Sequence, residues 1–247
     1  MPIESTNGVP LPRRAMVFAA GLGTRMRPIS DRMPKALVEV GGKALIDHTL
    51  DRLAEAGVET AIVNIHHFAD QIERHLSPRP TPQIILSDER SLLLDQGGGI
   101  KKALPLLGAD PFFVCNTDAF WIEGPRANLK RLAAAWNPEY MDCLLLVAGS
   151  ATSVGVEGPG DFTMDAAGRL IKREERGVAP FVYSGVGIIK PQLFMHEERQ
   201  VFGLAPFFFA AAKAGLLFGV RLDGIWLHVG TPQAIDEANR VMARSIL

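Results

Sequence analysis

The sequence predicts an α/β protein built on a mixed, mainly parallel, Rossmann-like sheet flanked by helices. Two observations carry this prediction. Apolar runs of strand length alternate with segments of helical period along most of the chain, a rhythm typical of parallel sheets with helices on both faces. In addition, 47% of the 247 residues are hydrophobic, which is enough to bury the core of one large domain.

Seven apolar runs have the length and composition of buried strands. They are Ala15–Ala20, Ala61–Ile65, Gln83–Leu86, Phe112–Cys115, Cys143–Val147, Phe181–Ile189 and Leu216–Arg221. Helical period is found between several of them, at Ile46–Ala56, Ala69–Leu76 and Ile100–Leu107. Strand followed by helix, repeated, predicts a largely parallel sheet.

The later part of the chain breaks this rhythm. Residues Asp161–Ile171 have the pattern of a hairpin that turns at Asp165-Ala166-Ala167-Gly168, which predicts a small antiparallel elaboration of the sheet. No internal repeat or linker divides the chain. We therefore expect a flexible N-terminal arm over residues 1–14 and a single domain over residues 15–247.

Composition and charge exclude several classes of function. With 26 basic and 27 acidic residues, the net charge is −1, so no nucleic-acid partner is expected. The longest apolar stretch, Phe202–Val220, is interrupted by Pro206 and Lys213 and predicts a helix and a strand, not a membrane span. Because the N-terminus has no apolar signal segment, a cytoplasmic location is expected. Cys115 and Cys143 lie in apolar runs and are interpreted as core residues.

The first predicted strand runs directly into a long glycine-containing and basic loop, GLGTRMRPISDRMPK, over residues 21–35. Exposed backbone N–H groups in such a turn can bind a phosphate. The loop lacks the GxxxxGK[ST] pattern of a Walker loop. It also lacks the third glycine of a dinucleotide-binding fingerprint, because Met26 stands there and Pro28 follows.

This loop resembles the signature of the sugar nucleotidyltransferases, approximately GxGTRxxPxTxxxPK, and the resemblance extends from about Ala15 to about Ala243. It implies the nucleotide-diphospho-sugar transferase fold, with the sugar bound on the side of the antiparallel elaboration. It also implies roles in nucleotide binding and catalysis for several residues of the loop. The nucleotide-binding residues are Ala20, Gly21, Gly23, Thr24 and Arg25, and the catalytic residues are Arg25 and Lys35, which neutralise phosphate charge. Arg27 and Arg32 are expected on the surface.

A second cluster, Asp95-Gln96-Gly97-Gly98-Gly99, precedes a helical run. Consecutive glycines at a helix start let the backbone pack against a flat group such as a base. From Gly97 to Asp118 the chain is similar to the N-acetylmuramate-1-phosphate uridylyltransferases of the same family. This resemblance implies that Gln96 and Gly98 contact the base.

The strand Phe112–Cys115 is followed by Asn116-Thr117-Asp118. A carboxylate at the carboxyl end of a central strand is in the usual ligand position of an open α/β sheet and can hold Mg²⁺ against phosphate oxygens. The family usually has glycine where Thr117 stands, and we expect this side chain to narrow the pocket. Asp118 is therefore expected to bind the metal and to take part in catalysis.

The resemblance also implies a sugar-binding set, which consists of Asn116, Asp161, Ser184 and Gly185. The small Ser184-Gly185 pair would let the sugar ring approach the strand closely. Asp161 lies in a turn that matches a turn of the uridylyltransferases.

One position departs from the family. In Ile225–Thr231 the family's last motif is intact except that His228 stands where the second metal-binding aspartate is expected. Imidazole is a poor ligand for Mg²⁺ and a better one for Mn²⁺ or Co²⁺. Four alternatives stay open: His228 changes the metal preference, Asp118 and the phosphates hold Mg²⁺ without it, it hydrogen-bonds a phosphate or sugar oxygen, or it only packs.

The function that the resemblance implies is nucleotidyl transfer from a nucleoside triphosphate, expected to be UTP, to a sugar 1-phosphate, expected to be N-acetylmuramate 1-phosphate, with release of pyrophosphate. This is a reaction of peptidoglycan recycling. The alternatives within the family are guanylyl transfer to mannose 1-phosphate and thymidylyl transfer to glucose 1-phosphate. A catalytically silent nucleotide-sugar binding protein is the alternative of another class, favoured by His228. The two substrates are the expected partners of a monomer or small homo-oligomer.

Overall fold

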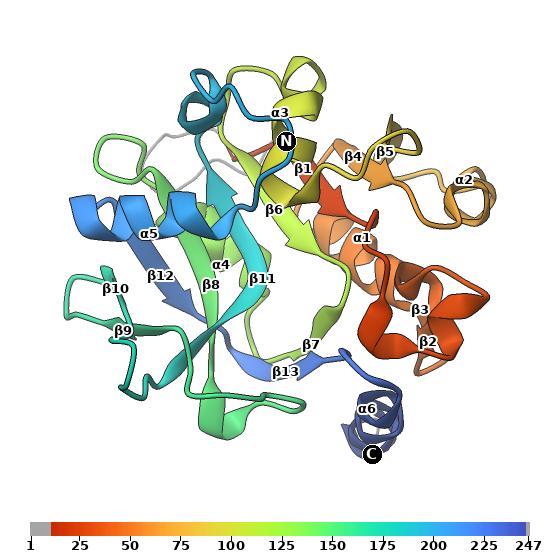
Figure 1. Cartoon of the computed structure of the whole chain (residues 1–247). Helices are drawn as coiled ribbons and strands as arrows, with labels where there is room; N and C mark the ends of the chain where they lie inside the picture. Colours follow the sequence, from red (N-terminus) through yellow and green to blue (C-terminus); the bar gives the residue numbers. More distant parts are fainter. Residues whose placement is uncertain (1–10, 246–247) are drawn as a thin grey trace.

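A computed structural model of the chain describes residues 11–245. Its central sheet runs in the order β12-β8-β11-β6-β1-β4-β5, and the β9-β10 hairpin joins it beside β11 (Figure 1). The strands are β1 (Arg14–Phe18), β4 (Thr60–Ile65), β5 (Gln83–Asp88), β6 (Phe112–Asn116), β8 (Cys143–Gly149), β9 (Phe162–Met164), β10 (Leu170–Lys172), β11 (Phe181–Ile189) and β12 (Leu217–Arg221).

The sheet is mixed and mainly parallel. β1 pairs in parallel with β4 and with β6, β4 with β5, and β8 with β12. Only β11 runs against its neighbours β6 and β8 within the main body of the sheet. The predicted fold class is thereby confirmed, and so is the antiparallel hairpin, whose two strands pair over Phe162–Met164 and Leu170–Lys172.

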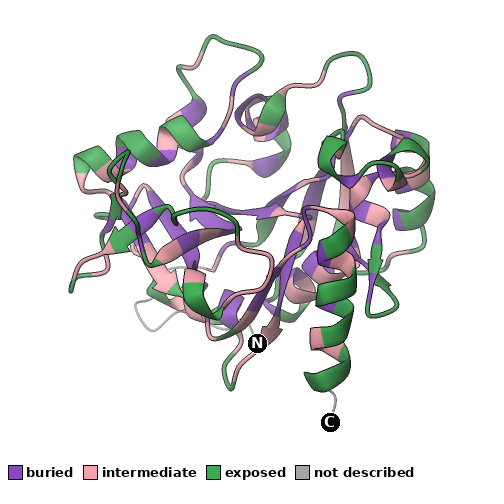
Figure 2. Ribbon diagram, turned by 60° about the horizontal axis from the view of Figure 1, so that its bottom comes forward, coloured by how far each residue is buried: buried purple, intermediate pink, exposed green. Residues whose placement is uncertain are grey.

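Helices cover both faces of this sheet (Figure 1). They are α1 (Leu45–Glu55), α2 (Ala69–Leu76), α3 (Asp95–Leu107), α4 (Asn128–Ala135) and α5 (Ala205–Ala214). Successive residues of a strand point to opposite faces of the sheet. The apolar side chains of the strands therefore belong to two separate clusters. Val17 and Cys115 pack with α1, α2 and α4 on one face, and Met16 and Val114 pack with α3 and α5 on the other. In Figure 2 the buried strands are enclosed by helices whose outer surfaces are exposed.

A separate two-stranded ribbon lies below the carboxyl ends of the strands. It consists of β7 (Ala119–Glu123) and β13 (Gly224–His228), whose register pairs His228 with Ala119. The ribbon packs in a third apolar cluster with Met26 of the first loop and with α6 (Pro232–Ser245). The short strands β2 (Glu39–Val40) and β3 (Lys43–Ala44) pair with each other beside it.

The loop after β1 folds into three short 3-10 helices, η1 (Thr24–Met26), η2 (Ile29–Asp31) and η3 (Lys35–Leu37). Two further ones, η4 (Ser150–Thr152) and η5 (Pro191–Phe194), follow β8 and β11. Arg27 and Arg32 are exposed on the first loop, in agreement with their expected surface position.

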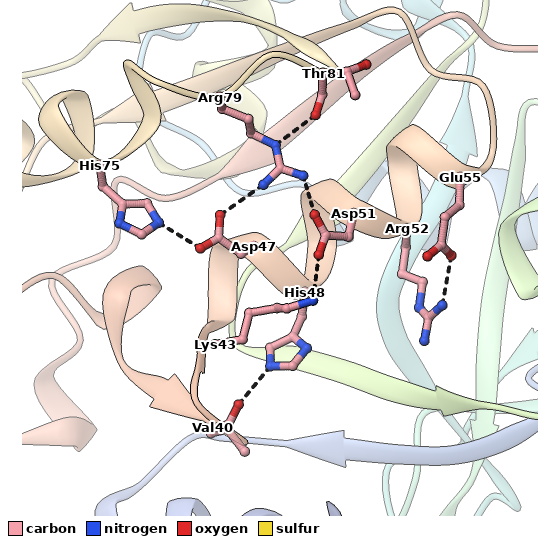
Figure 3. A network of polar contacts seen from close by, with 10 residues as sticks. All are labelled: Val40, Lys43, Asp47, His48, Asp51, Arg52, Glu55, His75, Arg79 and Thr81. Atoms are coloured by element: carbon pink, nitrogen blue, oxygen red, sulfur yellow. Dashed lines mark hydrogen bonds and ion pairs between the residues drawn. The ribbon is translucent and has the colours of Figure 1, made fainter. Parts of the chain in front are cut away.

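A network of polar contacts connects α1 with the end of α2 and with neighbouring segments (Figure 3). Asp47 of α1 accepts from His75 Nε2 at 2.7 Å and from Arg79 Nη1 at 3.0 Å. Asp51, one turn later, accepts from Arg79 and from Lys43 Nζ. Burial opposes ionisation of Asp51, but its hydrogen bonds to Lys43 and Arg79 outweigh this effect and lower its pKa. The network thus connects β3, α1 and the segment after α2.

Several details differ from the sequence prediction. The predicted arm covers residues 1–14, of which residues 1–10 lie outside the described part of the chain. Leu11, however, packs against the core, and β1 already begins at Arg14. Helix α3 begins at Asp95, so the three glycines lie inside its first turns and not before it. The ribbon strand β7, α4 and the β2-β3 pair were not predicted, although α4 buries Leu129, Leu132 and Ala133 at helical spacing.

Both cysteines are core residues, as interpreted from the sequence. Cys115 and Cys143 are at most 1% exposed, and burial raises the pKa of both thiols well above the ordinary value. Among residues 11–245, no helix is long and apolar enough to cross a membrane.

Candidate active site

Two cavities meet at the carboxyl ends of β1 and β6. The first, which we call the nucleotide cavity, has a volume of about 380 Å³. It lies between the end of β1, the start of η3 and the start of α3. Its lining residues are Phe18, Ala19, Ala20, Gly21, Lys35, Ala36, Asn64, Leu93, Asp95, Gln96, Asn116, Thr117, Asp118 and Val201.

The second, which we call the sugar cavity, also measures about 380 Å³. It lies between η1, β11 and the ribbon. Its lining residues are Arg25, Asn116, Asp118, Ala119, Val156, Glu157, Pro159, Gly160, Asp161, Arg173, Val182, Tyr183, Ser184, Gly185, Trp226 and His228. Asn116 and Asp118 line both cavities. A ligand in one cavity would therefore meet a ligand in the other at these two residues.

Asp118 lies at the centre of the polar contacts between the cavities. Its Oδ2 atom is 3.0 Å from Lys35 Nζ and 3.7 Å from His228 Nε2. Lys35 reaches it from η3, at the end of the first loop. His228 reaches it because β13 pairs with β7 directly after Asp118, and Val229 N donates to Asp118 O at 2.8 Å.

The charge of Asp118 is stabilised by these neighbours. Burial opposes ionisation of the carboxyl group, but His228 and Lys35 outweigh this effect and hold its pKa well below its usual range. Asp118 is thus ionised at neutral pH. It can attract a cation, and Lys35 beside it can donate to a phosphate oxygen.

The imidazole of His228 has a defined orientation. Its Nδ1 lies 3.3 Å from the carbonyl oxygen of Gly155 and can donate a hydrogen bond to this oxygen. Its Nε2 then faces Asp118 at 3.7 Å, longer than a hydrogen bond. This separation is within the span of two ligands that each lie about 2.1 Å from one ion.

These two side chains fit a metal ion only if the substrates complete its coordination. Among residues 11–245, no cluster of three or more His, Cys, Asp or Glu side chains could hold a metal by itself. A site of one carboxylate and one imidazole leaves most positions to phosphate oxygens and water. That is the usual manner in which Mg²⁺ is held with nucleotides.

The conformation of the first loop depends on glycine at position 23. Gly23 has φ of +63°, and a Cβ atom there would lie 3.1 Å from Ser30 and 3.2 Å from the Cβ of Lys35. Ser30 Oγ also donates to the carbonyl of Gly23 at 2.7 Å. Gly23 and Thr24 line neither cavity, whereas Ala20 and Gly21 line the nucleotide cavity. The glycine therefore allows the turn that brings Lys35 toward Asp118.

Arg25 is exposed and lines the sugar cavity. It does not line the nucleotide cavity, where the sequence placed it among the nucleotide-binding residues. It lines the same cavity as Asp118 and His228.

A buried pair beneath the nucleotide cavity was not found from the sequence. Asn64 Oδ1 accepts from Ala19 N at 2.8 Å and from Ala20 N at 3.3 Å, and its Nδ2 donates to Glu89 Oε1 at 2.9 Å. Glu89 is fully buried. Gly99 makes room for this pair, since a Cβ there would lie 2.9 Å from Glu89 Oε1. The signal in the sequence that could have indicated this pair is Asn64, a single polar residue inside the apolar run AIVNI.

On the base side, Gln96 and Asn116 are joined, since Gln96 Nε2 donates to Asn116 Oδ1 at 2.8 Å. Gly98 lines neither cavity: its N–H donates to Phe202 O, and a Cβ there would clash with the carbonyl of Gln200. Its smallness serves packing of α3 against residues 200–202. Thr117 lines the nucleotide cavity as expected, and its hydroxyl donates to Phe18 O at 2.8 Å.

On the sugar side, Asp161, Ser184 and Gly185 all line the sugar cavity. Asp161 Oδ2 accepts from Tyr183 N at 2.8 Å, and Ser184 Oγ donates to Leu146 O at 2.8 Å. Gly185 has φ of +89°, and a Cβ there would lie 3.0 Å from that of Asn116. Ser184 therefore presents mainly backbone to a ligand, and Gly185 is required for the position of Asn116.

Comparison with known proteins agrees with this geometry. Residues 15–183 match the model of the MobA-like NTP transferase domain. The chain is 50% identical to N-acetylmuramate alpha-1-phosphate uridylyltransferase of Caulobacter vibrioides, over 90% of this chain and 94% of that protein. The chain belongs to the sugar-1-phosphate nucleotidyltransferase family.

A second member of the family is more distant. N-acetylmuramate alpha-1-phosphate uridylyltransferase of Neisseria meningitidis is 34% identical over 91% of this chain and 96% of its own length. Among solved structures, UDP-glucose pyrophosphorylase complexed with UDP-glucose superposes with a TM-score of 0.78 at 17% identity, covering 95% of this chain and all of that chain. This last likeness concerns the fold alone.

Family membership makes the protein an enzyme of nucleotidyl transfer. Sugar nucleotidyltransferases generally use a divalent metal, and their substrates are a nucleoside triphosphate and a sugar 1-phosphate. Two cavities that meet at one ionised carboxylate suit such a pair of substrates.

Proposed function

We propose that the protein transfers the uridylyl group of UTP to N-acetylmuramate 1-phosphate and releases pyrophosphate. The observation that carries the proposal is the junction of the two cavities at Asn116 and Asp118, in a chain 50% and 34% identical to two enzymes named for this reaction. The peptidoglycan-recycling role follows from that substrate. The cytoplasmic location and the state as a monomer or small homo-oligomer stay predictions.

The nucleotide binds in the first cavity in this proposal. The backbone at Ala20 and Gly21, exposed after β1, contacts the phosphates. Gln96 lines the same cavity and is held by Asn116, so its amide group can recognise the edge of a base. Gly23, Thr24 and Gly98 do not line this cavity, and their contact with the nucleotide stays a prediction.

The sugar 1-phosphate binds in the second cavity, with its phosphate toward Asp118 and Arg25. An oxygen of this phosphate attacks the α-phosphorus of the nucleotide, and pyrophosphate leaves on the opposite side. No protein nucleophile is needed, because the attacking group is already an anion. Lys35 and Arg25 donate to the non-bridging oxygens, where negative charge is concentrated in the transition state.

Asp118 and His228 would hold the divalent metal, Mg²⁺ or, because of the imidazole, Mn²⁺ or Co²⁺. When bound, the ion supplies positive charge to the phosphates of both substrates. The protein's part is to place a carboxylate and an imidazole 3.7 Å apart at the cavity junction.

The experiment that tests this function is pyrophosphate release by the purified chain with three substrate pairs. They are UTP with N-acetylmuramate 1-phosphate, GTP with mannose 1-phosphate, and dTTP with glucose 1-phosphate, each in Mg²⁺ and in Mn²⁺. Turnover is expected with the first pair. Faster turnover with another pair would reassign the substrate, and tight nucleotide-sugar binding without turnover of any pair would show a silent binding protein.

A further inference from the structure

A third cavity adjoins the sugar cavity, and we call it the side chamber. Its volume is about 190 Å³. It shares Gly160, Asp161, Arg173 and Tyr183 with the sugar cavity. Its other walls are Phe162, Lys172, Ala205, Phe208 and Phe209. The side chamber therefore offers a largely aromatic extension of the sugar cavity with cationic side chains on its wall.

Arg173 stands at the boundary of these two cavities. Its Nε donates to Gly160 O at 2.9 Å, and its Nη1 lies 2.8 to 3.1 Å from the carbonyl oxygens of Glu174, Glu175 and Gly177. Among the residues that the structure describes, its guanidinium makes no ion pair with a carboxylate, and its Nη2 makes no hydrogen bond. Arg173 is thus oriented by backbone and keeps an uncompensated charge and a free donor.

A second arginine lines the sugar cavity without an acidic partner. Arg25 makes no ion pair within residues 11–245. It also lines a smaller cavity with Gly155, His228 and Thr231, whereas Arg173 lines the side chamber. The sugar cavity consequently has one free arginine next to the phosphate-binding end and another next to the side chamber.

N-acetylmuramate 1-phosphate carries two anionic groups: the phosphate on C1 and the carboxylate of its lactyl ether. We propose that Arg173 binds this carboxylate, with the lactyl methyl group against the phenylalanines of the side chamber, and so selects carboxylate-bearing sugars. This inference rests on the proposed function. A hexosamine phosphate without the lactyl ether has one anion and would leave Arg173 unused.

Acidic side chains that line the sugar cavity would oppose the binding of a second carboxylate unless a cation lay nearby. Asp161 and Glu157 both line this cavity, and their charges would repel a second carboxylate unless an arginine lay beside it. Asp161 already accepts from Tyr183 N.

The test compares two sugar phosphates as substrates of the wild type and of two variants of the 247-residue chain. We measure kcat/KM with saturating UTP for N-acetylmuramate 1-phosphate and for N-acetylglucosamine 1-phosphate, which lacks only the lactyl ether. Arg173→Met is expected to lower the ratio of the two values about 10- to 100-fold, as for loss of a charge-assisted hydrogen bond. Arg176→Met, an exposed arginine of the same loop, is the matched control and should leave the ratio unchanged.

A purely structural role of Arg173 would give a different result. Loss of its four backbone contacts would loosen the loop at residues 174–177 and reduce both activities by one common factor. An unchanged ratio in Arg173→Met therefore overturns the inference while turnover of N-acetylmuramate 1-phosphate by the wild type upholds the proposed function. Absence of that turnover in the wild type would contradict the proposed function itself.

A change on the substrate makes the test independent of whether the variant folds. The carboxamide of N-acetylmuramate 1-phosphate keeps the shape and loses the charge, so the wild type should use it about 10- to 100-fold less efficiently than the acid. Arg173→Met should hardly distinguish the two, as expected for direct partners in a double-mutant cycle. Equal use of acid and carboxamide by the wild type would overturn the inference.

Discussion

Lys35 is the residue whose role is most directly defined by geometry. Its Nζ lies 3.0 Å from Asp118 Oδ2, its side chain is 14% exposed, and it lines the nucleotide cavity. A partly buried ammonium group at this point is available to the phosphates as soon as they arrive. Its charge interacts more strongly with a phosphate there than it would on the surface, because little water screens it.

Lys35→Met keeps the length of the side chain and removes the charge. We expect kcat to fall about 10²- to 10³-fold, as for the loss of one donor to a charged transition state. Steady-state assays of pyrophosphate release measure this. Arg32→Met, an exposed position on the same loop, should leave kcat within about twofold, and a similar loss in both variants would show a general charge effect instead.

At the scale of elements, Glu89 connects four parts of the nucleotide cavity. It binds Asn64 at the end of β4 and, through Oε2, the backbone N–H of Leu94 at 3.1 Å, while its carbonyl accepts from His66 Nδ1 at 2.7 Å. Asn64 in turn holds the backbone at the end of β1. The side chain of Glu89 therefore links the end of β4 with the residue that precedes α3.

Glu89 also makes stability depend on pH. Burial raises the pKa of Glu89, and its hydrogen bonds to Asn64 and Leu94 offset this only in part. A raised folded-state pKa means that the carboxyl group contributes most stability below its unfolded-state pKa and loses it as pH rises through the folded-state value. We therefore expect the free energy of unfolding of wild type minus that of Glu89→Gln to fall as the pH rises above the unfolded-state pKa of glutamate, about 4.3.

Urea denaturation of both proteins at several pH values measures this difference, in which the other carboxyl groups cancel. An increase of the difference with pH would show that the ionised form of Glu89 is the stabilised one. No trend at all would show that its ionisation is not coupled to folding.

At the scale of the whole molecule, we expect the fold to form without a metal. Three apolar clusters hold the sheet, its helices and the ribbon, while Asp118 and His228 lie at the junction of two open cavities. We expect EDTA to abolish pyrophosphate release reversibly and to leave the thermal unfolding midpoint within about 1 °C. Circular dichroism and activity assays on one sample measure both. A large drop in the midpoint would indicate a structural metal.

The sequence determined much of this by itself. The alternation of apolar runs and helical segments was sufficient for the mixed sheet, because strand and helix periods are local properties of the chain. The first loop, with Gly21 and Lys35, was identified for the same reason, since its pattern lies within fifteen consecutive residues.

Only the tertiary structure decided how distant residues meet. The resemblance had placed Asp118 and His228 at the two metal-ligand positions, but the pairing of β13 with β7 that brings them together is a register that no local pattern specifies. Asn64, Glu89 and Arg173 gave no motif, because their roles arise from burial and from the orientation that backbone groups of other segments impose. Gly98 had a motif but serves packing, since the carbonyl that excludes a side chain there belongs to Gln200. Contacts between distant segments depend on the packing of the whole core, and the sequence of one segment does not contain them.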